Sequence, residues 1–107
     1  MVSLIVIYPA SNGTTFDWDY YSGPHVALAK RLLEPRGMVR IEIGRGVSGL
    51  PGTPAPYYAV ANLYFATSQQ LQSALGETAN ELIADEKKYY NGESVVQVNE
   101  IVDTMAR

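Results

Sequence analysis

Apolar and polar residues alternate along the chain in patterns that predict four strands and two helices. Val2–Tyr8 is apolar at both alternating sets of positions, which is typical of a strand covered on both of its faces. Met38–Gly44 alternates between apolar and polar residues and therefore predicts a strand with one polar face. Tyr57–Phe65 and Val95–Val102 are the remaining expected strands, and segments containing Gly, Pro or Asn precede both of them.

The first expected helix lies between the first two strands. Asp17 follows a turn-rich loop and is a candidate N-cap, and apolar residues recur at helical spacing up to Leu33. Pro24 interrupts the first turns and is suited to begin a second helical segment. The sequence Glu34–Gly37 contains the Pro and Gly residues that typically stop a helix.

The second expected helix follows the third strand. Thr67 or Ser68 is its N-cap, and its apolar stripe extends to about Lys88, with Gly76 as a point where the helix breaks or bends. The resulting order, βαββαβ, predicts an α+β, ferredoxin-like fold in which both helices cover one face of a four-stranded antiparallel sheet. No linker or repeat divides the chain, so we expect a single domain over residues 1–107.

The expected helices are too few to cover both faces of the expected sheet. The first, third and fourth strands are apolar on both faces, yet the fold places both helices on one face. Because a large exposed apolar surface usually marks an interaction site, we expect the other face to pack against a second copy of the chain. The sequence therefore predicts a homodimer joined sheet to sheet.

Composition and charge exclude several classes of protein. Eight Lys and Arg residues are scattered among eleven Asp and Glu, so nucleic acid, whose binding depends on phosphate neutralisation, is not an expected partner. The chain has no Cys and one His, which excludes disulfides and a multi-histidine metal site within one chain. The apolar run VSLIVIY is too short to span a membrane and lacks the features of a signal peptide. We therefore expect a cytoplasmic protein without membrane contact.

Three stretches of the sequence resemble the EthD family, which is named for ethyl tert-butyl ether degradation. FDWDYYSGPHVAL is similar to the family's Asp–Tyr–Tyr–His–Leu pattern on the first helix, although Ala27 stands where the family usually has Pro. APYYAVANLYFATSQQLQSAL resembles its third strand and the next helix, and LIADEKKYYNGESVVQVNEIV resembles its Ala-Asp, Tyr and Gln-x-x-Glu ending. The positions that match the first pattern are Asp17, Tyr20, Tyr21, His25 and Leu28.

This resemblance covers nearly the whole chain, from Val2 to about Val102. It implies a ferredoxin-like protomer of the dimeric α/β-barrel superfamily. Related members include cofactor-free monooxygenases, lactone isomerases, dehydratase-like pathway proteins and haem-binding proteins. The resemblance implies the fold more narrowly than the reaction, because one fold supports many chemistries.

His25 is the main candidate for chemistry. Imidazole is the side chain that exchanges protons near neutral pH, and Tyr21, four residues earlier, shares its face of a continuous helix. We expect both at the mouth of an apolar cavity between the first helix and the sheet, one as general acid or base and the other orienting a substrate oxygen. At such a mouth His25 contributes little to packing; the alternative is a structural histidine with local hydrogen bonds only. Asp85 is expected on a solvated helix face, with a supporting role in the site as the alternative.

Further residues are candidates for contacting a substrate. Tyr64 is expected as a third polar point of the cavity, provided that its strand face lies under the helices. Otherwise Tyr64 and Asn62 belong to the dimer contact. Arg40 pairs with Glu42 or meets an anionic ligand, and the ion pair is the favoured interpretation. The full set of candidate substrate contacts is Tyr20, Tyr64, Arg40 and Tyr90.

Three functions remain open from the sequence. The first is a small cofactor-free enzyme that oxygenates, isomerises or dehydrates a hydrophobic, oxygen-bearing small molecule, with His25 as acid or base. The second is a non-catalytic binding or accessory protein of a degradation or biosynthetic pathway. The third is a haem-binding protein with His25 as axial ligand and Arg40 or Arg45 near a propionate.

Overall fold

Four antiparallel strands form one sheet in the order β2-β3-β1-β4 in the computed structural model, which describes residues 1–106. The two central strands, β1 (Val2–Pro9) and β3 (Tyr57–Phe65), lie between β2 (Met38–Arg45) and β4 (Val95–Glu100). The chain order βαββαβ with this sheet order is the ferredoxin-like fold that the sequence predicts. Both edge strands are therefore paired on one side only.

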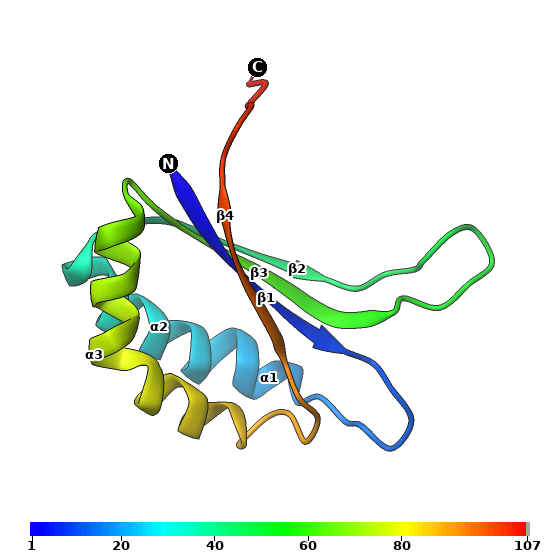
Figure 1. Cartoon of the computed structure of the whole chain (residues 1–107). Helices are drawn as coiled ribbons and strands as arrows, with labels where there is room; N and C mark the ends of the chain where they lie inside the picture. Colours follow the sequence, from blue (N-terminus) through cyan, green and yellow to red (C-terminus); the bar gives the residue numbers. More distant parts are fainter. Residues whose placement is uncertain (107) are drawn as a thin grey trace.

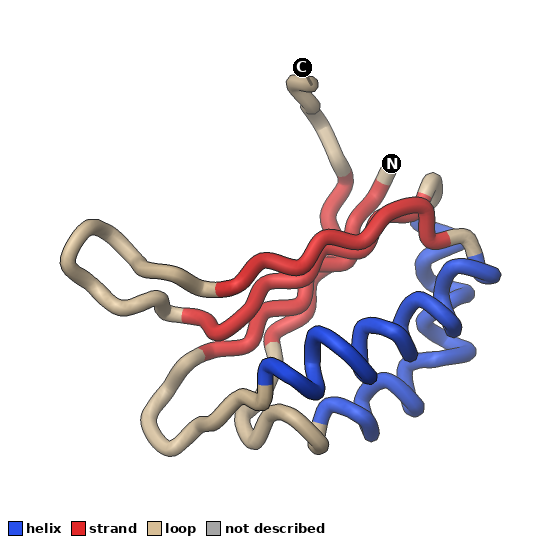
Figure 2. The backbone as a smooth tube through the Cα atoms, turned by 180° about the vertical axis from the view of Figure 1, so that it is seen from behind, coloured by secondary structure: helices blue, strands red, loops and turns tan. Residues whose placement is uncertain are grey.

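The helices all lie on one face of this sheet (Figures 1 and 2). Between β1 and β2 the chain forms α1 (Trp18–Tyr20), η1 (Tyr21–His25) and α2 (Val26–Leu33), followed by a short 3₁₀ turn, η2 (Glu34–Arg36). Between β3 and β4 it forms α3 (Ser68–Glu86), which runs beside α2. No helix within residues 1–106 is long and apolar enough to cross a membrane.

The helix that carries the candidate site widens at Pro24 instead of breaking there. Its start is as expected, because the Asp17 side chain accepts a hydrogen bond from the backbone N–H of Tyr20 at 3.1 Å. Pro24 lies inside the π-helical turn η1, where the backbone N–H of Val26 bonds to the carbonyl of Tyr21. This wider turn accommodates a residue without an N–H, so the helix continues and the expected second start at Pro24 is not found. Gly37, at φ 107°, then ends the segment as expected.

Helix α3, the second of the two expected helices, is continuous. Thr67 is its N-cap and accepts a hydrogen bond from the backbone N–H of Gln70 at 3.1 Å, as expected. Gly76 lies within the helix without interrupting it, so the expected break is wrong. The helix faces the sheet with Leu71 and Ala74, which are buried.

Strand register decides which side chains face the helices. Leu4 lies opposite Leu63 and Val6 opposite Ala61, so these residues and their neighbours two positions away point into the space under the helices. Val39 is exposed because an irregularity between Met38 and Arg40 shifts the register of β2, against the expected alternation. The buried core contains Val2, Leu4, Ala29, Leu33, Met38, Ala61, Leu63, Phe65, Leu71 and Ala74.

The opposite face of the sheet carries no helix. Ile5, Ile7 and Val60 lie on it half-buried within one chain, and Val95 beside them is 53% exposed. The long connection from Gly46 to Pro56 extends away from the sheet at one end, and the C-terminal residues extend away at the other (Figure 1). The last strand ends at Glu100, two residues before the expected end.

Candidate functional site

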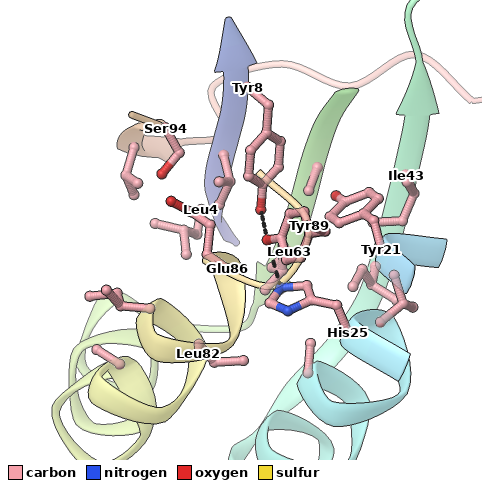
Figure 3. A pocket seen from close by; sticks show the side chains of 18 of the residues that line it. Leu4, Tyr8, Tyr21, His25, Ile43, Leu63, Leu82, Glu86, Tyr89 and Ser94 are labelled. Atoms are coloured by element: carbon pink, nitrogen blue, oxygen red, sulfur yellow. Dashed lines mark hydrogen bonds between the residues drawn. The ribbon is translucent and has the colours of Figure 1, made fainter. Parts of the chain in front are cut away.

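A cavity of about 190 Å³ lies between the helices and the covered face of the sheet (Figure 3). Its wall is mostly aliphatic and comes from β1, β2, β3, η1, α2 and α3, with the first residues of β4 at one side. Ile83 and Val96 on this wall are 61% and 55% exposed, so the cavity opens to the surface between α3 and β4. The polar side chains that reach the wall are Tyr8, Tyr21, His25, Glu86, Tyr89 and Ser94.

An aromatic cluster surrounds the polar end of the cavity. Tyr8, Tyr21, Tyr89 and Tyr90 are all buried. The ring of Tyr21 stacks on the imidazole of His25, with centroids 5.7 Å apart and an angle of 19° between the planes. The expected pairing of these two residues on one helix face is therefore present. The ring of Tyr89 also packs against the imidazole, at 4.6 Å between centroids, and lies 5.0 Å from the ring of Tyr21.

A chain of hydrogen bonds runs from Asp85 through His25 to the cavity. His25 Nδ1 lies 2.9 Å from Asp85 Oδ2, and His25 Nε2 lies 3.1 Å from the hydroxyl of Tyr89. The Tyr89 hydroxyl is in turn 2.7 Å from the hydroxyl of Tyr8 (Figure 3). These four residues come from η1, α3, the turn after α3 and β1, so the fold of the whole domain assembles the chain.

The Asp85 end of this series of hydrogen bonds reaches the surface near α3. The hydroxyl of Tyr20 donates a hydrogen bond to Asp85 Oδ1 at 2.8 Å, and Lys88 Nζ lies 3.5 Å from the same oxygen. Asp85 is 8% exposed, so the expectation that it lies on a solvated face is wrong. Both of its carboxylate oxygens have partners, and the alternative of a supporting role agrees with this geometry.

The charges around Asp85 favour its ionised form. Burial by itself raises the pKa of Asp85, but hydrogen bonds from His25 and Tyr20 outweigh burial. The positive charge of Lys88 acts in the same direction, and the pKa of Asp85 lies below its ordinary value. An ionised Asp85 accepts the Nδ1 proton of the imidazole, which leaves Nε2 of a neutral His25 as a hydrogen-bond acceptor.

The tyrosines of the cavity stay protonated. Burial raises the pKa values of Tyr8 and Tyr89 far above the ordinary tyrosine value, and it raises the pKa of Tyr21 to about 12. The negative charge of Glu86 adds to each of these shifts. Near neutral pH the three hydroxyls are therefore uncharged donors and acceptors.

The structure separates the residues that the sequence proposes as one site. His25 and Tyr21 line the cavity, whereas Tyr20 lies at the outer end of the chain. The hydroxyl of Tyr90 donates to the backbone carbonyl of Pro9 at 2.7 Å, and Tyr90 does not line the cavity. His25 is 9% exposed and packs against the rings of Tyr21 and Tyr89, so the expectation that it contributes little to packing is wrong.

Tyr64 and Arg40 lie on the opposite face of the sheet. The hydroxyl of Tyr64 donates to Glu42 Oε1 at 3.0 Å, and the Arg40 guanidinium pairs with the same carboxylate. These bonds lower the pKa of Glu42, with Arg40 as the largest cause. Tyr64 as a polar point of the cavity is therefore wrong, because its strand position and that of Asn62 point away from the helices. The favoured ion pair of Arg40 is present.

Sequence reasoning missed Tyr8 and Tyr89 as members of the site. Tyr8 lies on the same face of β1 as Leu4 and Val6, and this face points towards the helices. The alternation of side chains along the strand therefore predicts that Tyr8 points under the helices. Tyr89 follows the end of α3, where side-chain direction cannot be read from helical spacing. Its place depends on the turn that carries the chain towards β4.

Haem ligation does not fit His25 in this arrangement. Both imidazole nitrogens have hydrogen-bond partners, Asp85 and Tyr89, and both partners are buried. An iron ligand would have to displace one of them. Within residues 1–106 there is also no cluster of three or more His, Asp or Glu side chains that could hold a metal ion.

The fold and cavity define a small ferredoxin-like protein with a buried His–Tyr pair on the wall of an apolar cavity. The EthD domain matches residues 14–93, which includes His25, Asp85 and Tyr89, and the chain belongs to the EthD family. This confirms the resemblance seen in the sequence. No match to the chain was found among curated proteins.

Solved structures of related fold cover almost the entire chain. An EthD-like protein from Ralstonia eutropha JMP134 has a TM-score of 0.88 at 23% identity, with 98% of this chain and 95% of that chain covered. An ethyl tert-butyl ether degradation (EthD) family protein from Bacillus halodurans C-125 has a TM-score of 0.66 at 19% identity, covering 94% and 97%. A dimeric ferredoxin-like protein from an uncultured marine organism has a TM-score of 0.57 at 10% identity and covers 100% of both chains. These matches support the fold.

Proposed function

We propose that this protein binds an uncharged, apolar, oxygen-bearing small molecule in the cavity and moves a proton on it with His25 as the base. The observation that carries the proposal is the series of hydrogen bonds from Asp85 through His25 and Tyr89 to Tyr8, which ends in a mostly aliphatic cavity. A perturbed, hydrogen-bonded set of titratable groups in an apolar pocket is the usual arrangement of a proton-transfer site.

The size and charge of the cavity define the ligand. Apolar cavities of about 150 Å³ are large enough to take up benzene, so about 190 Å³ with an open mouth suits a compound of one or two rings. Glu86 places a carboxylate on the wall, while Lys88 lies on the far side of Asp85 and does not line the cavity. A carboxylate ligand would therefore be repelled there without a compensating cation.

The proposed proton transfer proceeds through hydroxyl groups. His25 Nε2 takes the proton of Tyr89, Tyr89 takes that of Tyr8, and Tyr8 takes a proton from the ligand. The products are an imidazolium and a ligand anion, such as an enolate. Asp85 stabilises the imidazolium at 2.9 Å from Nδ1, and the proton returns by the reverse path.

Deuterium exchange into 1-indanone, an uncharged two-ring ketone, tests this function. Wild-type protein in D₂O should speed the exchange of the hydrogens next to the carbonyl, followed by proton NMR. We expect His25→Gln to reduce the protein-dependent rate by about 100-fold, the low end of what a positioned acid or base contributes. Tyr57→Phe, at an exposed tyrosine outside the cavity, is the matched control and should exchange like the wild type.

The outcomes separate catalysis from binding. If 1-indanone binds and its exchange rate equals that in buffer, the base function is wrong and the protein is a carrier or accessory protein. Absence of binding by 1-indanone and by apolar two-ring compounds would contradict the cavity itself as a ligand site.

We also propose that the protein acts as a homodimer through the uncovered face of the sheet. Ile5, Ile7 and Val60 make this face apolar, and β1 and β3, which carry them, are the central strands. The similar fold from an uncultured marine organism is described as dimeric, which supports the proposal. The cavity lies on the other side of the sheet, so dimer formation would leave its mouth between α3 and β4 accessible.

A further inference from the structure

The charge state of His25 sets the direction of the hydrogen bonds from Asp85 to Tyr8. Each hydroxyl carries a single proton, so each charge state allows one order of donors and acceptors along these bonds. When the imidazole is neutral and Nδ1 donates to Asp85, Nε2 must receive the hydroxyl proton of Tyr89. Tyr8 must then donate its proton to the Tyr89 oxygen, 2.7 Å away. The oxygen of Tyr8 is left as a hydrogen-bond acceptor at the cavity.

A proton on His25 reverses every bond between Nε2 and Tyr8. Nε2 then donates to Tyr89, Tyr89 donates to Tyr8, and the proton of Tyr8 becomes available at the cavity. The reversal requires rotation of two hydroxyl groups and no movement of a heavy atom. It also requires no change at Asp85, which accepts from Nδ1 in both states.

We infer that Tyr8 is the group that meets the polar atom of the ligand, and that the proton on His25 decides whether Tyr8 accepts or donates a hydrogen bond there. The inference rests on the proposed function, since it takes the cavity as the ligand site. With neutral His25 the site selects hydroxyl or N–H donors, such as phenols and enols. With protonated His25 it selects carbonyl and ether oxygens.

Other ionisable groups near the hydrogen bonds from His25 to Tyr8 could also change ligand binding with pH, and their positions separate them from His25. Asp85, with its partners Tyr20 and Lys88, lies beyond the imidazole, away from the cavity. Glu86 and Tyr21 line the cavity, and the hydroxyl of Tyr21 interacts with that of Tyr8. Glu86→Gln therefore serves as the variant that removes this carboxylate while the hydrogen bonds from His25 to Tyr8 remain.

Three two-ring probes of similar shape test the inference. Indole carries a donor only, 1-indanone carries an acceptor, and indene carries neither. All three are uncharged between pH 5 and pH 8, the range in which histidine side chains change charge, so any pH dependence belongs to the protein. Dissociation constants can be measured by ligand-observed NMR. We expect the ratio of indole affinity to 1-indanone affinity to be higher at pH 8 than at pH 5 by about fivefold or more, and indene affinity to be constant.

Variants locate the cause of the change. His25→Gln should make the affinity ratio independent of pH. Tyr89→Phe should do the same while binding persists, because Tyr8 then rotates freely and serves as donor or acceptor at any pH. Tyr57→Phe, outside the cavity, should keep the pH-dependent ratio, and Glu86→Gln should keep the direction in which the ratio changes with pH.

Each outcome decides the inference. A wild-type ratio that does not change with pH, or a Tyr89→Phe ratio that changes as in the wild type, contradicts the switch while leaving the proposed ligand site intact. Loss of the pH dependence in Glu86→Gln assigns it to the carboxylate and also contradicts the switch. If none of the three probes binds, the proposed ligand site fails, and the inference fails with it.

Discussion

The hydroxyl of Tyr89 lies 3.1 Å from Nε2 of His25 and 2.7 Å from the hydroxyl of Tyr8, so Tyr89 separates the imidazole from Tyr8. Nε2 is therefore engaged within the protein, and the base is proposed to act through hydroxyl groups. Contact with the ligand and holding of the proton, two roles that a single histidine often combines, are therefore assigned to different residues. In the proposed mechanism Tyr8 contacts the ligand, and His25 holds the proton.

Replacing His25 by Ala should reduce stability as well as abolish function. The imidazole is buried against Tyr21 and Tyr89, and its loss leaves the carboxylate of Asp85 without its Nδ1 partner. We expect a loss of about 3 kcal/mol in the free energy of unfolding, measured by urea denaturation. His25→Gln retains an amide at this position and should lose less. Equal stability of His25→Ala and wild type would show that the buried contacts contribute little.

Asp85 should stabilise the protein in a pH-dependent way. Its pKa in the folded state lies below the ordinary value of 3.8, so the unfolded chain binds the proton more readily. The stabilisation is complete above the unfolded-state pKa and is lost as pH falls through the folded-state pKa. The difference in unfolding free energy between wild type and Asp85→Asn should therefore shrink as the pH falls below about 4. A difference that persists at pH 2 would contradict the ionised pairing.

Much of the fold could be predicted from the sequence, and less of the site. Short apolar runs bounded by turn residues predict the strands, and Thr67 and Gly37 mark helix ends through local chemistry. Asp85 was assigned to solvent because its neighbours Lys87 and Lys88 are charged. Its burial depends on how α3 packs against the turn η1, which is a tertiary contact that spacing does not reveal.

Alkaline titration should show two classes of tyrosine. Burial raises the pKa values of Tyr8, Tyr21 and Tyr89 well above the ordinary value of 10.0, so these three should remain protonated at pH 11 and be the last tyrosines to ionise. The folded state then retains more protons than the unfolded state, and stability should fall as pH rises above 10. Absorbance at the phenolate band measures the ionised fraction. Ionisation of all eight tyrosines in one step while the protein remains folded would contradict the enclosed cluster.

The uncovered face of the sheet should hold two copies of the chain together. Ile7 lies on this face of central strand β1, and a charge there would be desolvated in a sheet-to-sheet contact. We expect wild type to sediment as a dimer at micromolar concentration, with an interface that buries on the order of 1,600 Å² in total.

Ile7→Asp should shift the protein towards the 11.7 kDa monomer, while circular dichroism remains that of the folded chain. Ser73→Asp adds the same charge to an exposed position of α3 and should remain dimeric. A monomeric wild type, or an Ile7→Asp variant as dimeric as Ser73→Asp, would contradict this interface. If Ile7→Asp also loses its fold, Ile5→Asn, an uncharged change on the same face, tests the same contact.

Because the cavity lies on the opposite side of the sheet, a folded monomeric variant should still bind 1-indanone.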